Sequence, residues 1–333
     1  MNKLQQSACL IIFSLFATTK PIVPENDGAK FTIENITGNV DFVGSIPSDV
    51  HTIINTIKNP ERFIRVGAPL PKGILMMGHP GVGKTTIARL IAKETECPII
   101  ITSAAQFVNT YVGTGPAAIR SLFKTARDKL AQQEDPYAYD AEPYHHRPRQ
   151  SKKDQKKKDV KPVIVFIDEI DSIGVNRGQM TGGAGMEERN TLNQLFTEME
   201  GLHECNNIIV IAASNEDEGY FDAALRSRFT YIAHVPLPNY VDRTAILKHF
   251  STKSLFAPGI SLEYLSSDEY TQGYAGRDLR KLVEHIARTA ANDMSLANDK
   301  VVITQTHITT GFKEYNDRKK REAEAEAKRR SPW

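Results

Sequence analysis

The sequence predicts an α/β fold, in which a parallel sheet lies between two layers of helices and is followed by a small helical domain. Two observations carry this prediction. Short apolar runs typical of buried strands alternate with helical segments over residues 31–237. After the turn sequence PLPNY, which begins at Pro236, residues 238–312 have a mostly helical pattern. A chain of 333 residues is long enough for two such domains.

The expected strands are apolar runs of a length typical of buried strands, and they occupy residues 73–78, 98–102, 163–167, 206–214 and 231–235. The expected helices occupy residues 85–95, 117–130, 190–199 and 277–292. In the second of these, Ile119, Leu122 and Phe123 fall on one side, so this helix has an apolar face to bury.

Three segments depart from this alternation. Residues 1–30 contain an apolar run from Ala8 to Ala17, about half the roughly 20 residues of a membrane-spanning helix, so an export signal, a short anchor and a hydrophobic leader remain open. Residues 131–161 have few aliphatic side chains, three prolines and a lysine cluster, which indicates an exposed, disordered basic insertion. Residues 313–333 are almost wholly charged and read as a solvated helix or tail.

The segment GHPGVGKTT, residues 78–86, is a complete phosphate-binding loop between a strand and a helix. Its glycines permit the backbone to present successive N–H groups to phosphate oxygens. Lys84 would reach the β- and γ-phosphates of a nucleotide, and the Thr85 hydroxyl would coordinate Mg²⁺. The residues expected to surround the phosphates are His79, Pro80, Gly81, Val82, Gly83, Lys84, Thr85 and Thr86.

The apolar strand at residues 163–167 ends in Asp168 and Glu169. A strand that emerges beside the phosphate loop would deliver Asp168 to the Mg²⁺ shell and place Glu169 to orient and deprotonate an attacking water. The pair therefore predicts the hydrolytic half of a nucleotide site that holds Mg²⁺.

The sequence resembles the ATPase domain of the AAA+ family, and within it most of all the ATPase module of FtsH-type membrane proteases. The resemblance runs from about residue 41 to residue 312, interrupted by the insertion. Its carrying segments are DFVG (41–44), residues 58–86, FVNTYVGTGPAAIRSLF (107–123), VIVFIDEIDSIG (163–174), ERNTLNQLFTEMEG (188–201), IIVIAASN (208–215) and GYAGRDLRKLV (273–283).

The resemblance implies roles for further residues. Asn215 matches a polar sensor near the γ-phosphate, and Arg228, with Arg226 as a second candidate, matches an arginine that enters the site of a neighbouring subunit. Tyr111 and Val112 match a pore loop that grips an extended polypeptide. The base of the nucleotide would lie between the DFVG segment, which includes Val43 and Gly44, and the hydrophobic start of the helical domain. Gly276 and Arg277 are further candidates for nucleotide binding.

Two departures from the FtsH-type pattern bear on these roles. The chain has RSRFTY where FtsH-type proteins carry RPGRFDR, so Tyr231 stands at the place of a second arginine and the form is closer to the katanin and spastin branch. Arg277 stands where a small residue is common; it could contact phosphate, or it could be a surface arginine at a helix start.

The zinc motif H-E-x-x-H is not found, and the nearest segment, HECNN, ends in Asn207. We therefore expect no peptidase activity of the chain itself.

The function expected from these features is a Mg²⁺-dependent ATPase that couples hydrolysis in a homo-oligomeric, hexameric ring to the unfolding, translocation or remodelling of protein substrates. The alternative is an ATP-dependent regulatory or scaffold subunit that works with a separate peptidase. Nucleic acid is a less favoured partner, because no aromatic residues are interleaved with the lysines of the insertion. The expected location is cytoplasmic, or membrane-associated through residues 1–30 with the ATPase domain facing the cytoplasm.

Overall fold

The computed structural model describes residues 31–108, 114–134, 160–173, 183–202, 207–293 and 301–330, apart from residues 39, 41, 69, 222 and 253. In this part of the chain a six-stranded sheet has the order β1-β3-β4-β5-β2-β6. The pairs from β3 to β6 are all parallel, whereas β1 lies antiparallel to β3 at the edge. The strands are β1 (Thr32–Glu34), β2 (Gly73–Met77), β3 (Ile99–Ser103), β4 (Val163–Asp168), β5 (Ile208–Ser214) and β6 (Tyr231–His234).

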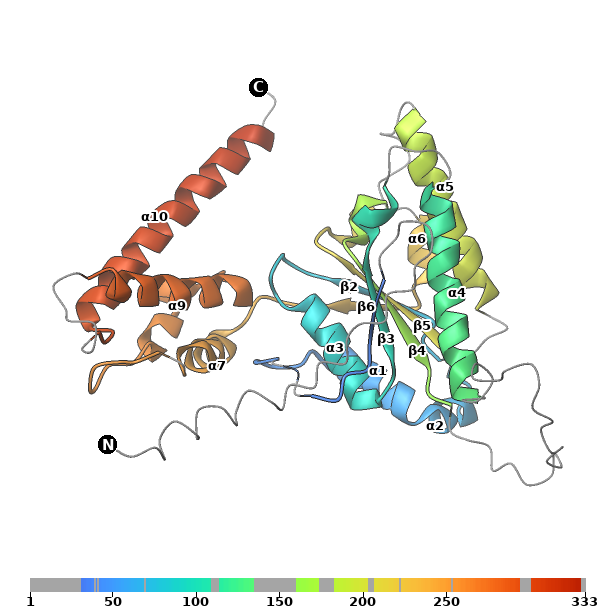
Figure 1. Cartoon of the computed structure of the whole chain (residues 1–333), viewed down its shortest axis with the longest axis horizontal. Coiled ribbons are helices and arrows are strands. Elements are labelled where there is room, and N and C mark those ends of the chain that lie inside the picture. Colours follow the sequence, from blue (N-terminus) through green and yellow to red (C-terminus); the bar gives the residue numbers. More distant parts are fainter. Residues whose placement is uncertain are drawn as a thin grey trace, which may run out of the picture.

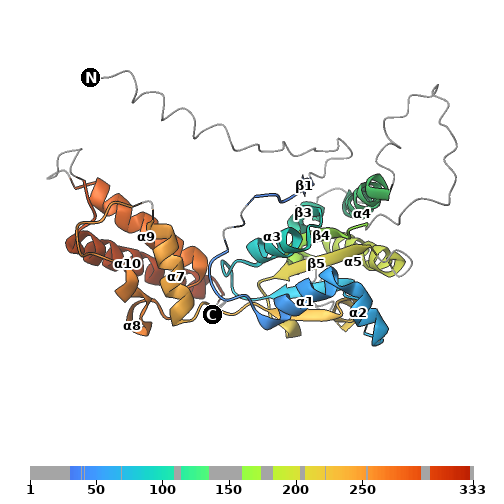
Figure 2. The ribbon, with the colours of Figure 1, turned by 90° about the horizontal axis from the view of Figure 1, so that it is seen from below.

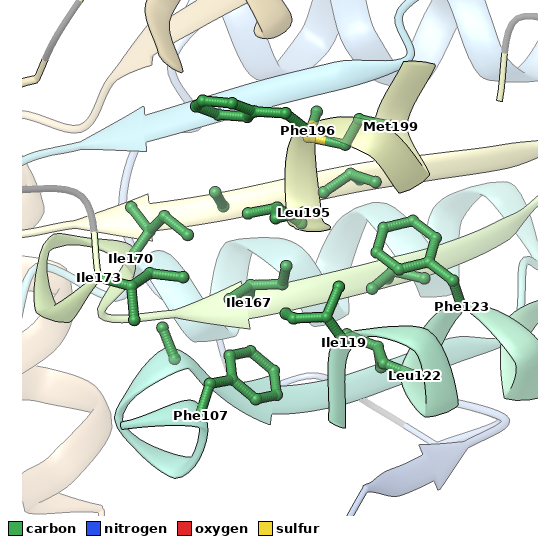
Figure 3. Packing of buried hydrophobic residues seen from close by; sticks show 14 of the residues in the cluster. Phe107, Ile119, Leu122, Phe123, Ile167, Ile170, Ile173, Leu195, Phe196 and Met199 are labelled. Atoms are coloured by element: carbon green, nitrogen blue, oxygen red, sulfur yellow. The ribbon is translucent and has the colours of Figure 1, made fainter. Parts of the chain in front are cut away.

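Helices cover both faces of this sheet (Figure 1). The helices α1 (Ser48–Lys58) and α3 (Lys84–Thr95) pack on one face, and α4 (Thr114–Glu134) and α5 (Gly183–Gly201) pack on the other. Alternate strand residues point to opposite faces, so Leu75 lies in one hydrophobic cluster while Ile74 and Met76 lie in the other. Figure 3 shows the α4/α5 side, where Phe123 and Phe107 pack against the sheet. The short α2 (Pro60–Arg65) and α6 (Ala223–Arg228) complete this domain.

A second body of helices lies beside the sheet, as Figures 1 and 2 show. It contains α7 (Tyr240–Ser251), the 3₁₀ turn η4 (Glu263–Ser266), α8 (Asp268–Thr271), α9 (Gly276–Ala291) and α10 (Gln305–Arg330). These elements enclose their own hydrophobic cluster, in which Leu247, Leu282 and Ile308 are fully buried. The chain passes from β6 into this body through residues 235–239.

The predicted fold class is confirmed: helices flank a mostly parallel sheet, and a helical body follows. Sequence patterns missed β1 because it has only three residues, and they missed the six-residue α2 for the same reason. They also missed α1, although Val50, Ile53, Ile54 and Ile57 stand at helical spacing and form its buried face. The antiparallel direction of β1 is also a finding of the structure alone.

Two predicted boundaries differ from the structure. The helix α4 continues to Glu134, so the first residues of the predicted insertion 131–161 are helical rather than disordered. Residues 135–159 lie outside the described residues. The boundary predicted at residue 312 falls inside α10, where Tyr315 is 4% exposed and belongs to the helical cluster. Residues 1–30 also lie outside the described part, and no helix within that part has the length and apolar character needed to cross a membrane.

Candidate functional site

The loop between β2 and α3 follows a path that only glycine allows at several points. Gly81 and Gly83 have φ angles of +85° and +101°, in the left-handed region. At Gly78 a Cβ atom would lie 2.3 Å from the carbonyl oxygen of Val235, the residue after β6, so a side chain cannot fit there. Helix α3 begins directly after the loop, and its first N–H groups have no intrahelical acceptor. The loop therefore has the geometry of the N-terminal anion site that the sequence predicts.

Lys84, the first residue of α3, is 6% exposed and turns back into the loop. Its Nζ donates to the carbonyl oxygens of Gly78 at 2.7 Å and His79 at 3.1 Å, and to Oδ1 of Asn215 at 2.8 Å. Burial lowers the pKa of this ammonium group, although the neighbouring carboxylates, chiefly Asp168, oppose the shift. The structure thus brings the predicted lysine and the predicted sensor together, and the poorly solvated cation favours a bound anion.

Thr85 and Asp168 meet on the other side of the loop. The Thr85 hydroxyl donates to Oδ2 of Asp168 at 2.7 Å, while Oδ1 of Asp168 accepts the backbone N–H of Glu169 at 3.0 Å. Neighbouring ligands of an octahedral Mg²⁺ lie about 3 Å apart, so this pair of hard oxygen atoms fits two positions of the ion's shell. The residues present therefore suit Mg²⁺.

Glu169 follows β4 in an unusual backbone conformation, with φ at 55° and ψ at 46°. A left-handed non-glycine residue at a strand end is uncommon and is often found at functional sites. Its side chain is exposed, and its Oε2 accepts the Ser103 hydroxyl, at the end of β3, at 3.4 Å. Asp171 fixes the backbone of Asn215, because the Asn215 backbone N–H donates to Oδ1 of Asp171 at 3.2 Å.

These groups line one end of a cavity of about 620 Å³ between the sheet and the helical body. The predicted residues Val43, Gly44, Gly276 and Arg277 line the same cavity. The helical body touches the phosphate loop directly, since the Arg277 backbone N–H donates to the carbonyl oxygen of Gly81 at 3.0 Å. The phosphate loop and the start of α9 therefore meet at the wall of the cavity.

Other predicted residues lie elsewhere. Arg228, at the end of α6, forms a short ion pair with Glu200 and lies over the ring of Phe196. Its backbone abuts Gly73, the first residue of β2, whereas the phosphate loop leaves the last residue of that strand. Arg226 pairs with Glu218, with 3.7 Å between Nη1 and Oε1. Tyr111 and Val112 fall outside the described residues, as does the HECN part (203–206) of the segment HECNN.

Sequence reasoning missed four polar residues at the site: Ser45, Ser103, Asp171 and Asp242. Asp171 and Ser103 could have been suspected, because each stands close to the end of a strand that reaches the loop. Asp242 had a weaker signal in the helix-start pattern N-x-x-D after PLP. Its contact with Ser45 joins residues 197 positions apart, and nothing local announces it.

This loop, opening a helix beside a strand that ends in carboxylates, places the chain among the P-loop nucleotide-binding proteins. Residues 74–237 match the family described as "ATPase family associated with various cellular activities (AAA)". Residues 74–237 of the chain therefore form a domain of this family of AAA ATPases.

Several relatives share about a third of their residues with the chain over the aligned region. The "ATP-dependent zinc metalloprotease FtsH" of Marinobacter nauticus is 36% identical over 264 residues, which cover 78% of this chain and 36% of that protein. The "ATP-dependent zinc metalloprotease FTSH 8, chloroplastic" of Arabidopsis thaliana is 37% identical over 264 residues, which cover 78% of this chain and 34% of that protein. The chain thus spans roughly a third of the length of these curated relatives.

A solved structure, "Crystal structure of FIGL-1 AAA domain in complex with ADP", superposes on the chain with a TM-score of 0.62. The two sequences are 24% identical, and the match covers 84% of this chain and 85% of that one. At this identity the likeness supports the fold.

Proposed function

We propose that this chain is a Mg²⁺-dependent ATPase that assembles into a ring of its own copies and converts ATP hydrolysis into mechanical work on a polypeptide. One observation carries the hydrolytic part of the proposal. Three residues from separate parts of the sequence converge at one end of the cavity, namely Lys84, Asp168 and Asn215. Lys84 donates to the loop carbonyl of Gly78 at 2.7 Å and to Asn215 at 2.8 Å, and Asp168 accepts the Thr85 hydroxyl at 2.7 Å.

Binding of the nucleotide would use the loop and the first turn of α3. The backbone N–H groups and the Lys84 ammonium would hold the β- and γ-phosphates, and Thr85 and Asp168 would hold Mg²⁺. The ion, when bound, neutralises negative charge that develops on the phosphate oxygens. Lys84 is already oriented toward this position by the carbonyl oxygens of Gly78 and His79, so little reorganisation is needed on binding.

Hydrolysis would depend on Glu169 and Asn215. Glu169 directly follows β4 and is exposed at the cavity, so its carboxylate can accept a proton from a water that attacks the γ-phosphate. Asn215 donates and accepts through one amide, and its Oδ1 already accepts from Lys84, which leaves its Nδ2 group for the water or the phosphate.

The ring part of the proposal is supported by the position of Arg228. Arg228 lies at the beginning of β2 and the phosphate loop at its end, so the strand of five residues separates them by roughly 17 Å. The arginine therefore cannot serve its own site, although it could serve that of a neighbour. Relatives named as ATP-dependent metalloproteases suggest a polypeptide as the substrate, gripped by Tyr111 and Val112.

Glu169→Gln tests the hydrolytic role. The amide keeps the size of the side chain but cannot accept the proton, so we expect ATP turnover to fall at least about 100-fold while nucleotide binding remains. Steady-state phosphate release and equilibrium binding of a fluorescent ATP analogue measure the two properties.

The matched control is Glu216→Gln, which changes an exposed glutamate just after Asn215 that does not line the cavity. Its turnover should stay within about twofold of the parent. Equal hydrolysis by Glu169→Gln and the parent would contradict the proposal.

A further inference from the structure

Residues 42–46, here called the strap, cross from the sheet domain to the helical body along one wall of the cavity. Phe42 and Ile46 pack against the hydrophobic cluster between the sheet and α1/α3. Val43, between them in sequence, packs against the separate cluster of the helical body. The strap therefore contacts both hydrophobic cores, and its position depends on how the two bodies are held together.

Asp242 fixes the strap to the helical body. Its Oδ1 accepts two hydrogen bonds from Ser45, from the backbone N–H at 2.6 Å and from the hydroxyl at 2.7 Å. Its Oδ2 accepts the backbone N–H of Asn239 at 3.3 Å, and its own N–H donates to the Asn239 side chain at 2.9 Å. The carboxylate is 9% exposed and serves two elements at once, the strap and the start of α7.

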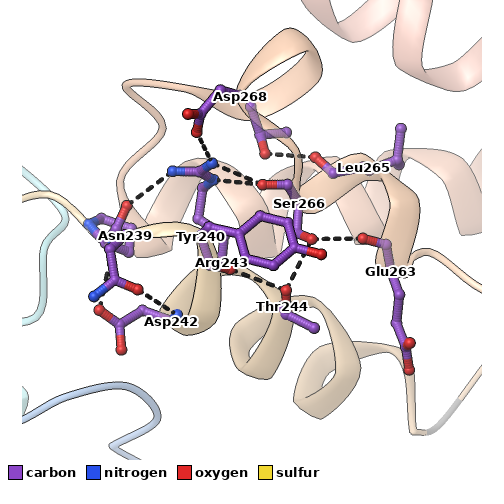
Figure 4. Close-up of polar contacts among 11 residues, drawn as sticks. Asn239, Tyr240, Asp242, Arg243, Thr244, Glu263, Leu265, Ser266 and Asp268 are labelled. Carbon is purple, nitrogen blue, oxygen red and sulfur yellow. Dashed lines mark hydrogen bonds and ion pairs between the residues drawn. The ribbon is translucent and has the colours of Figure 1, made fainter.

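The next residue, Arg243, anchors this end of α7 within the helical body (Figure 4). Its guanidinium group donates to the carbonyl oxygen of Ser266 at 2.7 and 2.9 Å and forms a short ion pair with Asp268. Arg243 is 3% exposed, and its hydrogen bonds hold the start of α7 against the rest of the helical body. The backbone that carries Asp242 is therefore held in place.

The opposite end of the strap reaches the phosphate loop. A Cβ atom placed on Gly83 would lie 3.6 Å from the Phe42 ring, so the ring packs on the loop just before Lys84. Between Phe42 and Ser45, Gly44 has a φ of +125°, which lets the backbone turn. A Cβ atom added to Gly44 would lie 3.5 Å from Oδ1 of Asp242, so the backbone passes close to this carboxylate. The strap thus links the phosphate loop to α7.

From this geometry we infer that Asp242 is a positioning residue for the nucleotide: by holding Ser45, it keeps the strap closed along the cavity and thereby sets nucleotide affinity. This inference rests on the proposed function for the identity of the ligand. A strap that is closed for only a fraction of the time reduces apparent affinity by that fraction. Turnover at saturation is preserved, because Asp242 contacts none of Lys84, Asp168 and Glu169 in the described residues.

Asp242→Ala is the main test. We expect the dissociation constant for mant-ADP and the KM for ATP to rise about tenfold, with kcat within about twofold of the parent, because two charge-assisted hydrogen bonds are lost. Ser45→Ala removes only the hydroxyl hydrogen bond to Asp242, so it should raise the dissociation constant and the KM about threefold. Added to Asp242→Ala, it should cause no further change. Asp242→Asn keeps an acceptor for Ser45 and should bind within about threefold of the parent.

Asn239→Ala is the matched control, because it removes the side-chain cap of α7 and leaves the strap contact in place. It should lower the melting temperature about as much as Asp242→Ala, with little change in mant-ADP affinity. Equal weakening by the two alanine variants would assign the effect to helix capping and overturn the inference, as would unchanged affinity in Asp242→Ala. If Asp242→Ala does not fold, Ser45→Ala decides, and its unchanged affinity overturns the inference. Absence of ATP turnover in the parent would instead contradict the proposed function, while mant-ADP binding would still test the strap.

Discussion

At the scale of single residues, Lys84 shows a conflict between binding and stability. Its ammonium group is buried, and burial lowers its pKa below the ordinary value of 10.5. A lowered pKa means that the folded state without nucleotide disfavours the charged form, although the loop carbonyls and Asn215 satisfy its donors. The charge therefore does not favour the fold, which agrees with the proposed role of Lys84 in binding phosphate.

Replacement of Lys84 by Met should separate these two effects. Methionine fills a similar volume without a charge, so we expect nucleotide binding to be lost while the melting temperature without nucleotide equals or exceeds that of the parent. Differential scanning fluorimetry and binding of a fluorescent ATP analogue measure the two quantities. A clear drop in melting temperature would show that the ammonium group stabilises the empty fold.

The pH dependence of this variant has a defined sign. Since Lys84 loses its proton more readily when folded than when unfolded, its unfavourable contribution is full below the folded pKa and disappears as the pH rises from there toward 10.5. The stability advantage of Lys84→Met should therefore shrink at alkaline pH.

At the scale of elements, α10 combines a packed half with an exposed half. Tyr315 is buried against Tyr274, and burial raises the pKa of both phenols to about 12. One turn further, the Lys319 ammonium lies 3.9 Å from the centre of the Tyr274 ring and donates to Asp278 at the start of α9. Beyond Lys319, the side chains of α10 that the structure describes are exposed. The packed half of α10 thus supports the first turn of α9, where the Arg277 backbone contacts the phosphate loop.

Tyr315→Ala should destabilise the helical body by about 3 kcal/mol, because a large aromatic side chain leaves a buried site. The exposed Lys320→Ala, on the same helix, serves as the control and should change stability by less than about 0.5 kcal/mol. Urea unfolding followed by circular dichroism measures both. Equal stability of the two variants would mean that α10 is not part of the folded body.

At the scale of the whole molecule, the separation between Arg228 and the phosphate loop makes assembly part of the proposed mechanism. In the single chain Arg228 is paired with Glu200 and stacked on Phe196. An arginine from a neighbour can raise phosphoryl-transfer rates by roughly 10³ to 10⁵. A single subunit should accordingly hydrolyse ATP slowly.

Mixing two inactive variants tests this arrangement. Arg228→Ala keeps Glu169, and Glu169→Gln keeps Arg228, so a mixed ring contains interfaces with one intact copy of each. In a mixture of equal amounts, about a quarter of the interfaces should regain activity. The rate per subunit of the parent should also rise with protein concentration. If the mixture is as inactive as its components and the parent's rate per subunit does not depend on concentration, Arg228 does not act at a neighbour's nucleotide site.

The sequence by itself determined the fold class, and it located the residues that are proposed to hold phosphate. Both are encoded locally: strands and helices follow the hydrophobic period, and the loop needs its glycines, lysine and threonine within nine consecutive positions. Asp168 could be anticipated for a related reason, because it stands at the end of an apolar strand and the carboxyl ends of parallel strands meet at one edge. Asn215 follows another such strand, but its expected role came from the family resemblance.

Tertiary structure alone decided how the cavity is closed. The Ser45–Asp242 contact, the Arg277–Gly81 contact and the packing of Tyr315 join residues far apart in sequence, and such contacts leave no periodic signal. The antiparallel β1 and the distance of Arg228 from the loop likewise depend on strand direction and on which end of β2 each segment meets. Local chemistry thus specifies the groups that are proposed to bind phosphate, whereas the packing of two separate hydrophobic cores sets the walls around them.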